Sequence, residues 1–178
     1  MKVSEIIKIG SNLLKEKKIQ SHILDSELLL SKTLNKSREE ILINLDQKID
    51  KKNISTFKEY LQRRSKCEPM AYILEEKEFW SNKFFVTKDT LIPRPETELL
   101  VEKLLKMYDG KKISILDIGT GSGCIIISLL CNLQKSKGIG IDISKKAIFA
   151  AKKNAFRYNL FNRIKFLNKS FENIFEKK

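Results

Sequence analysis

Three glycines and two aspartates between positions 117 and 142 have the types and spacing of a small-molecule site. Gly119, Gly121 and Gly123 alternate in the segment GTGSG, which follows an apolar run and opens a helical pattern. Glycine lets the backbone turn tightly, and it lets a ligand approach without interference from a Cβ atom. A single glycine would suffice for a strand–helix turn, so three in alternation indicate ligand binding.

The two aspartates indicate which ligand the loop takes. The spacing GxGxG differs from the GxGxxG of a dinucleotide site. Asp117 would repel a pyrophosphate, but it would attract a cationic amino group such as that of S-adenosylmethionine. Asp142 ends the next apolar run, where an acidic side chain accepts hydrogen bonds from ribose hydroxyls. A dinucleotide enzyme is the weaker alternative. The expected S-adenosylmethionine site comprises Asp117, Gly119, Thr120, Gly121, Ser122, Gly123 and Asp142.

The segment FLNKSF at 166–171 follows a third apolar run. In folds of this kind the loop at that place commonly packs on the adenine. Phe171 is the aromatic candidate for this contact, and Asn168 and Ser170 could hydrogen-bond the edge of the base. A plain core position is the alternative for Phe171.

Strand and helix patterns alternate after Gly110. Strands are expected at 113–118, at 138–143 and from 164 to 167, and helices at 123–133 and 145–158. Such an order predicts an α/β fold with a parallel sheet and right-handed crossovers. We interpret it as the first half of a class I, Rossmann-like S-adenosylmethionine-dependent methyltransferase sheet.

The first 66 residues have helical periodicity only. Ser21 is a candidate N-cap, Ser37 and Glu40 fit a capping box, and a further helix is expected at 55–64. Pro69 then breaks the helical pattern. We expect a small helical bundle at 1–66, whose function the periodicity does not reveal, a β-hairpin linker at 67–90 and a partial methyltransferase domain at 91–178.

The segment between Pro69 and Gly110 holds the expected hairpin and one more helix. Aromatic and β-branched residues from Tyr72 to Val86 predict paired short strands, with Ser81-Asn82 between them. The prolines of LIPRPETELL predict an extended segment before a helix that ends near Met107.

Composition excludes several classes of protein. Hydrophobic residues make up 42% and charged residues 32%, which is typical of a globular chain, and no apolar run has the length of a membrane span. Three cysteines without a CxxC support neither a disulfide framework nor a metal site, and His22 has no catalytic surroundings. We expect a cytoplasmic location, no signal peptide and no membrane partner.

The net charge of +13 favours no partner strongly. A basic balance of this size can mark a nucleic-acid partner. Here the lysines are spread along the whole chain, in short and separated clusters. A solvated surface is therefore the favoured interpretation, and nucleic acid is the alternative.

Several motifs together resemble the release factor glutamine N5-methyltransferase family. These are DSELLL at 25–30, EPMAYILEEKEFW at 68–80, LIPRPETE at 91–98, LDIGTGSGCI at 116–125 and GIDIS at 140–144. LIPRPETE followed at this distance by DIGTGSG is the specific combination, because the glycine loop alone would indicate only a methyltransferase. The resemblance covers nearly the whole chain. Glu75 departs from it, since the family usually has glycine there.

The resemblance implies methyl transfer from S-adenosylmethionine to a glutamine amide of a peptide chain release factor. It implies that Gly119–Gly123 and Asp142 bind the cofactor, that Phe171 lies beside the adenine, and that the N-terminal helices engage the release factor. Family members hold the amide with an Asn-Pro-Pro-Tyr (NPPY) motif after the fourth strand. No NPPY occurs in these 178 residues, so no catalytic residue is assigned.

The missing motif leads us to expect a C-terminally truncated enzyme whose strand at 113–118 exposes an unpaired edge and apolar surface. Two other functions remain open. One is a nucleic-acid adenine methyltransferase, since such enzymes use a similar loop and clamp. The other is a non-enzymatic remnant that still binds a release factor.

Overall fold

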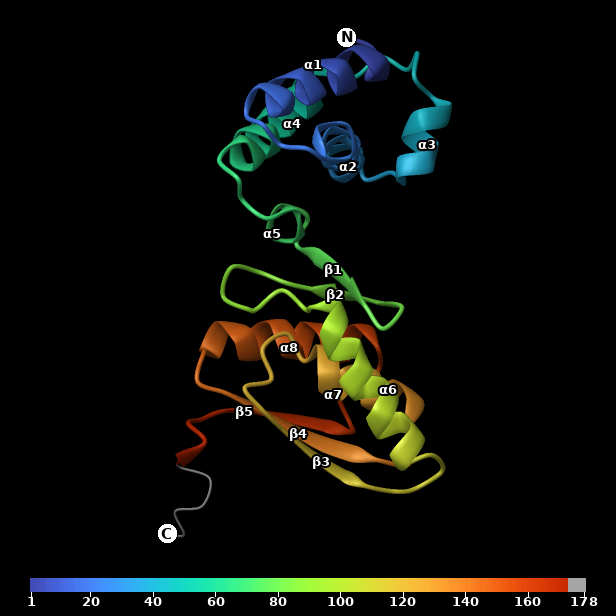
Figure 1. Cartoon of the computed structure of the whole chain (residues 1–178), viewed down its shortest axis with the longest axis vertical. Helices are drawn as coiled ribbons and strands as arrows, with labels where there is room; N and C mark the ends of the chain where they lie inside the picture. The colour runs from blue at the N-terminus through green and yellow to red at the C-terminus, as the bar shows by residue number, and fades with distance from the viewer. Residues whose placement is uncertain (173–178) are drawn as a thin grey trace. The chain divides into compact units, whose positions relative to one another are not determined.

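The computed structural model describes residues 1–172 and divides the chain into two compact units, with the boundary between Leu74 and Glu75. The first unit is helical, and the second holds a hairpin and a three-stranded parallel sheet (Figure 1). The expected functional boundaries at 66 and 90 stay a prediction.

The N-terminal unit consists of five helices. They are α1 (Val3–Glu16), α2 (His22–Leu34), α3 (Arg38–Ile43), α4 (Lys51–Ser65) and α5 (Met70–Leu74). Their apolar faces meet in one core, whose fully buried members include Leu14, Leu29, Leu30 and Phe57. Burial of these faces is the main force that holds short helices in place.

The helix boundaries follow local signals in part. The capping box of Ser37 and Glu40 is present and confirmed, with Glu40 N–H donating to Ser37 Oγ at 3.1 Å. Ser21 occupies the N-cap of α2, but its hydroxyl donates to Asp25 and caps no backbone amide. The helix expected at 55–64 begins earlier, because the Asp50 carboxylate accepts from the Asn53 amide and caps it.

One predicted strand is wrong. Tyr72 and Ile73 lie in α5 and not in the hairpin. Pro69 accepts the first hydrogen bonds of this helix, and Ile73 is fully buried in the helical core. Packing of Ile73 against the other helices therefore overrides its β propensity.

The hairpin begins four residues later than its aromatic pattern suggested. β1 (Glu76–Phe79) pairs antiparallel with β2 (Asn82–Phe85). Its turn is Trp80-Ser81 and not Ser81-Asn82, and Asn82 pairs with Phe79. Trp80 and Ser81 have φ of 51° and 56°, the left-handed values that a two-residue type I′ turn requires.

The C-terminal elements confirm the α/β prediction to within two residues at each end. After the 3-10 turn η1 (Pro95–Thr97) come α6 (Glu98–Met107), β3 (Ser114–Ile118), α7 (Cys124–Asn132), β4 (Lys137–Asp142), α8 (Lys145–Arg157) and β5 (Ile164–Asn168). The strands are parallel in the order β3-β4-β5.

One face of this sheet is covered by α7 and α8 (Figure 1). Leu116, Ile118 and Ile139 share the opposite face by strand alternation and register, and all three are exposed. Within residues 1–172, β3 pairs only with β4. The expected open edge and apolar surface at this strand are therefore present in the described part of the chain.

No helix in the described part of the chain is long and apolar enough to cross a membrane.

Candidate functional site

The glycine loop lies where the parallel strands β3 and β4 end at the same edge of the sheet. Asp117 pairs with Gly140 in the register, and Asp142 is the last residue of β4. Because the two strands are parallel, the two aspartates and the loop after β3 come together at this edge. This is where open α/β sheets bind ligands.

Hydrogen bonds to β4 anchor the start of the loop. The amides of Gly119 and Thr120 both donate to the Ile141 carbonyl, at 2.8 and 2.9 Å. Gly119 and Gly121 have φ of 74° and 55°, which L side chains rarely adopt. A Cβ added at either glycine would meet no atom closer than 3.9 Å, so backbone conformation and not crowding within the chain requires glycine there.

Gly123 is required for a second reason. It precedes α7 with φ of 78°, and a Cβ there would lie 3.0 Å from Ile127 Cδ1 and 3.3 Å from Ala151 Cβ. The three loop glycines therefore have different roles. Gly119 and Gly121 form the open loop, whereas Gly123 lets α7 pack closely against α8.

Asp142 shapes the loop with both carboxylate oxygens. Its Oδ2 accepts from the Gly121 amide at 2.9 Å, and its Oδ1 accepts from the Ser144 amide at 2.8 Å. A carboxylate oxygen can accept more than one hydrogen bond, so Asp142 can still accept from the hydroxyls of a ligand.

Asp117 is held in a half-buried position by the loop itself. Its Oδ2 accepts from the Thr120 hydroxyl at 2.7 Å. Burial raises the pKa of the Asp117 carboxyl above its ordinary value, the Thr120 hydrogen bond opposes that rise, and the nearby Asp142 charge adds to it. Two neighbouring carboxylates are stabilised by a cation between or beside them. The arrangement therefore suits a ligand that carries positive charge, such as a sulfonium with an ammonium group.

Asn154 is an important residue that sequence reasoning missed. It is fully buried on α8, and its Nδ2 donates to the Ser122 carbonyl at 2.8 Å and the Phe85 carbonyl at 2.9 Å. Its Oδ1 accepts from the Phe85 amide at 2.7 Å. One side chain thus joins the glycine loop to β2. The available signal was an asparagine on the apolar face of an otherwise amphipathic helix.

Glu98 of the LIPRPETE segment has a structural partner. Its Oε1 accepts from the Trp80 amide at 2.8 Å, in the turn of the hairpin. Glu98 lies in the first turn of α6, and no sequence pattern marks its contact with the hairpin turn.

The expected base-binding segment is only partly available for that role. Asn168 Nδ2 donates to the carbonyls of Asp142 and Ile143 at 3.0 and 2.8 Å, so its amide hydrogens tie β5 to the end of β4 instead of facing a base. Phe171 is exposed after β5, so the alternative of a plain core position is wrong. Its contact with adenine stays a prediction, as does that of Ser170.

Cys124 begins α7 beside the loop but is unsuited to nucleophilic chemistry at neutral pH. Burial raises the pKa of its thiol to about 11. The thiol is therefore neutral in that range, and the thiolate is the reactive form.

Two known families match the chain in succession. Residues 5–74 match the PrmC N-terminal domain, and residues 109–178 match a methyltransferase domain. The first match covers the helical unit, and the second covers the sheet with the glycine loop. The family evidence thus bears on both units of the chain.

Similar proteins carry both parts. The bifunctional methyltransferase of Rickettsia felis is 35% identical over 99% of this chain and 39% of its own length. The release factor glutamine methyltransferase of Buchnera aphidicola subsp. Baizongia pistaciae is 43% identical over 87% of this chain and 56% of its own. The chain thus spans about half or less of the length of these relatives. Among solved structures, the N-terminal domain of human METTL16 has a TM-score of 0.45 and 23% identity, over 68% of this chain and 49% of that one.

Proposed function

Because the chain belongs to the release factor glutamine methyltransferase family, we propose that it forms the S-adenosylmethionine site and the partner-binding helical domain of such an enzyme. The single observation that supports this most is the placement of Asp117 and Asp142 beside the glycine loop, at the same edge of the sheet. Two carboxylates with an open loop between them suit a cationic nucleoside ligand better than a pyrophosphate.

In this proposal five residues have separate roles in binding. Asp142 accepts hydrogen bonds from the ribose hydroxyls, and Asp117 attracts the ammonium group. The open backbone at Gly119 and Gly121 admits the ligand, and the exposed ring of Phe171 covers the adenine.

When bound, S-adenosylmethionine supplies an electrophilic methyl group on its sulfonium. The proposed acceptor is the side-chain amide of a release factor glutamine, whose nitrogen is a poor nucleophile because its lone pair is delocalised. Catalysis would therefore depend on orientation and electrostatics more than on acid–base chemistry. The NPPY motif with which family members hold the amide is not among these 178 residues. The proposal accordingly assigns cofactor binding, and not the holding of the amide, to the residues described.

Calorimetry with S-adenosylmethionine tests the cofactor site. Asp142→Ala is expected to weaken binding by about 1–3 kcal/mol, because it leaves ribose hydroxyls without a charged acceptor. Asp109→Ala is the matched control, since Asp109 is an exposed aspartate outside the site. Equal affinity of the Asp142 variant and the unchanged chain would remove Asp142 from the site.

A transfer assay with methyl-labelled S-adenosylmethionine tests the reaction. Label on a purified release factor, and none on the same factor with its target glutamine replaced by alanine, would show that this chain also carries out the transfer. Label on adenine of added RNA would instead establish a nucleic-acid adenine methyltransferase. Binding without transfer to either substrate would reduce the proposal to a cofactor-binding protein.

A further inference from the structure

Much of the net positive charge lies in one stretch of the C-terminal unit. Between Asp142 and Glu172 the sequence has eight basic residues and no acidic one. The basic residues are Lys145, Lys146, Lys152, Lys153, Arg157, Arg163, Lys165 and Lys169. The cofactor site described above uses none of them.

Part of this charge forms a regular pattern on α8. Lys145, Phe149, Lys152 and Phe156 follow one another at spacings of four, three and four residues. At 3.6 residues per turn they fall within an arc of about 60° and extend along about 16 Å of helix. Phe149 is 65% exposed and Phe156 72% exposed. We call these four residues the α8 stripe.

A further phenylalanine extends the stripe beyond the end of the helix. The ring of Phe161 is 57% exposed, and its centroid lies 6.2 Å from that of Phe156. Phenylalanine at such exposure is unusual for a surface without a partner, and three on one side of a unit form an apolar patch.

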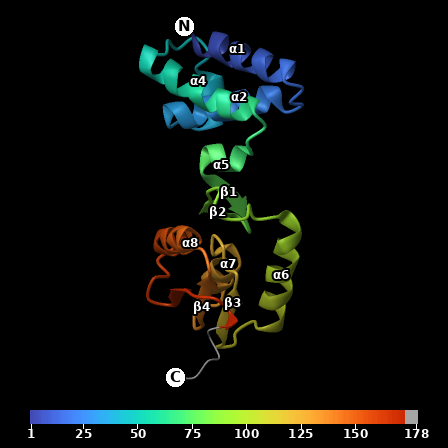
Figure 2. The same cartoon turned by 90° about the vertical axis from the view of Figure 1, so that its left-hand side faces the viewer.

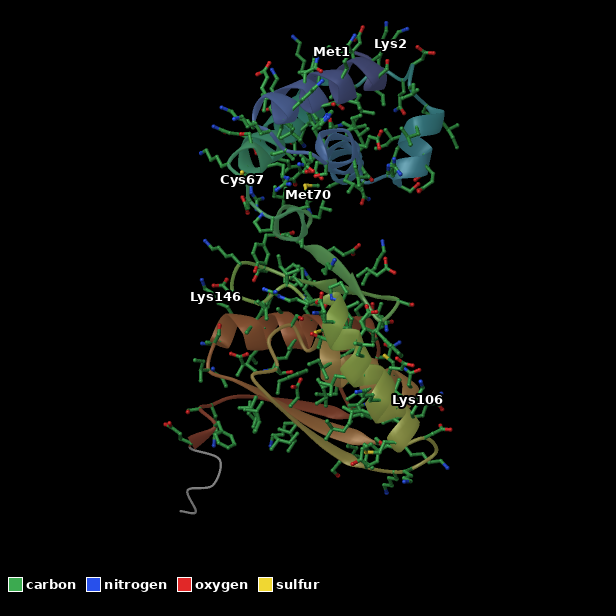
Figure 3. The ribbon with its side chains drawn as sticks, viewed as in Figure 1. Met1, Lys2, Cys67, Met70, Lys106 and Lys146 are labelled. Carbon is green, nitrogen blue, oxygen red and sulfur yellow. The ribbon has the colours of Figure 1, made fainter. Side chains whose placement is uncertain are left out.

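The neighbouring cations of α8 already have partners. Lys146, labelled in Figure 3, lies 3.4 Å from the Asp89 carboxylate, and Arg157 lies 3.4 Å from Glu76. The ammonium of Lys153 lies 3.5 Å from the centre of the Phe85 ring. These groups hold the helix against the rest of the unit.

The two lysines of the stripe are different. Within residues 1–172, neither the Lys145 nor the Lys152 side chain forms a hydrogen bond or an ion pair, and both are exposed. Their charges are available to a ligand that approaches the stripe. The α8 stripe therefore presents unpaired lysine side chains in alternation with exposed aromatic rings.

The stripe lies on the side of α8 opposite the cofactor loop. The buried side of the helix holds Ala151, which packs near Gly123, and Asn154, which binds the Ser122 carbonyl. These residues are about 130–170° around the helix from the centre of the stripe at 100° per residue. A ligand on the stripe is consequently separate from the site of methyl transfer, so the stripe is a docking surface and not a substrate pocket.

We propose that the α8 stripe binds single-stranded nucleic acid. Bases would stack on Phe149, Phe156 and Phe161, and phosphates would pair with Lys145 and Lys152. Proteins that bind single strands without sequence preference combine these two kinds of contact. A membrane surface fits less well, because a membrane-bound helix buries a continuous apolar face and here lysines interrupt the aromatic line.

Fluorescence anisotropy of a labelled 12-nucleotide oligouridylate, titrated with the full chain at several salt concentrations, tests the proposal. Phe149→Ala with Phe156→Ala is expected to weaken binding at least tenfold, since stacking of one base contributes about 1–3 kcal/mol. Lys145→Ala with Lys152→Ala is expected to weaken binding and to reduce the salt slope by about 1.4, at about 0.7 per phosphate contact on a single strand.

Matched variants separate stacking from general charge and apolar effects. Phe149→Leu with Phe156→Leu keeps apolar surface but removes the rings, and it should bind as weakly as the alanine pair. Lys103→Ala with Lys106→Ala removes the same charge from α6, where Figure 3 labels Lys106, and should leave the salt slope unchanged. Circular dichroism checks that each exposed substitution leaves the fold intact.

Three results would overturn the proposal. The first is undiminished oligouridylate binding by the phenylalanine variants. The second is full binding by the leucine pair, which would indicate apolar docking without stacking. The third is phenylalanine-dependent binding to vesicles of phosphatidylglycerol and phosphatidylcholine with none to the oligonucleotide, which would assign the stripe to a membrane surface.

Discussion

At the scale of single residues, the candidate site is defined by carboxylates whose surroundings differ. Asp142 is tied to two backbone amides, whereas Asp117 has one hydroxyl partner and a raised pKa. Ionisation of Asp117 is therefore less favourable in the ligand-free protein than in water. Functional sites often hold charges in this way, because the ligand later offsets the cost.

Asp117→Asn should separate binding from stability. We expect it to weaken S-adenosylmethionine binding by about 1–3 kcal/mol, because the ammonium loses its charged partner. The same change should raise the urea midpoint of the ligand-free chain at pH 7, since a buried carboxylate near Asp142 is removed. Calorimetry and urea unfolding measure the two effects. A lower midpoint with unchanged affinity would show that Asp117 has a purely structural role.

The pH dependence follows from the raised pKa of Asp117. A carboxyl whose pKa is raised in the folded state favours folding while it is protonated, and this contribution is lost as the pH rises through the folded pKa. Cofactor affinity should change in the opposite sense and fall as the pH drops through the same value. Calorimetry between pH 4.5 and 8 should show this fall in the unchanged chain and its loss in Asp117→Asn.

The three cysteines should differ in reactivity. Cys67 is exposed, whereas burial raises the pKa of the Cys124 thiol to about 11. At pH 8 Cys67 should react with Ellman's reagent much faster than Cys124, because Cys67 is exposed and burial keeps the Cys124 thiol protonated. Cys67→Ser should remove the fast phase alone. A fast phase that survives this change would contradict the assignment.

At the scale of elements, the glycine loop depends on contacts from distant parts of the chain. β4 anchors its start through the Ile141 carbonyl, and α8 holds the Ser122 carbonyl through Asn154. Asn154 also holds β2, so the hairpin and the loop share one buried clamp. The hairpin is thereby part of the support of the cofactor loop.

Asn154→Ala should test that clamp. The expected loss of stability is about 2–4 kcal/mol, because two backbone carbonyls and one backbone amide lose their buried partner. Cofactor affinity should also fall as the loop loses its anchor at Ser122. Urea unfolding and calorimetry provide the two readouts. Asn162→Ala, at an exposed position just after α8, is the control and should change neither.

At the scale of the whole molecule, the two units have separate cores. The helical core lies entirely within residues 1–74. A partly buried ion pair adds to it: Asp25 of the DSELLL segment lies 2.7 Å from Arg64. Figure 2 shows the same units from a second side, with α1, α2 and α4 grouped in the helical unit.

A polypeptide of residues 1–74 should therefore fold by itself. Thermal unfolding followed by circular dichroism should be cooperative, and Leu29→Ala should destabilise the unit by about 2–5 kcal/mol through loss of a buried side chain. Ile43→Ala, at an exposed position, should leave the transition in place. A broad, noncooperative transition would show that the helical core needs the rest of the chain.

Sequence patterns were sufficient for the C-terminal elements and for the outline of the site. Apolar strands, GTGSG and the two aspartates are local signals, and parallel pairing brings their ends together. The capping box at Ser37 is likewise local, since its partners lie three residues apart. Such features are determined by the sequence because their geometry involves neighbours along the chain.

Only the tertiary structure decided the rest. Tyr72 and Ile73 are helical because Ile73 packs into a core built by distant helices. The Asn154 clamp and the Glu98 contact with Trp80 join residues 69 and 18 positions apart, respectively, and no local pattern marks such partners. The α8 stripe also became visible only when burial showed which side of the helix faces solvent. Sequence determined what each segment can form, and long-range packing decided which side chains meet.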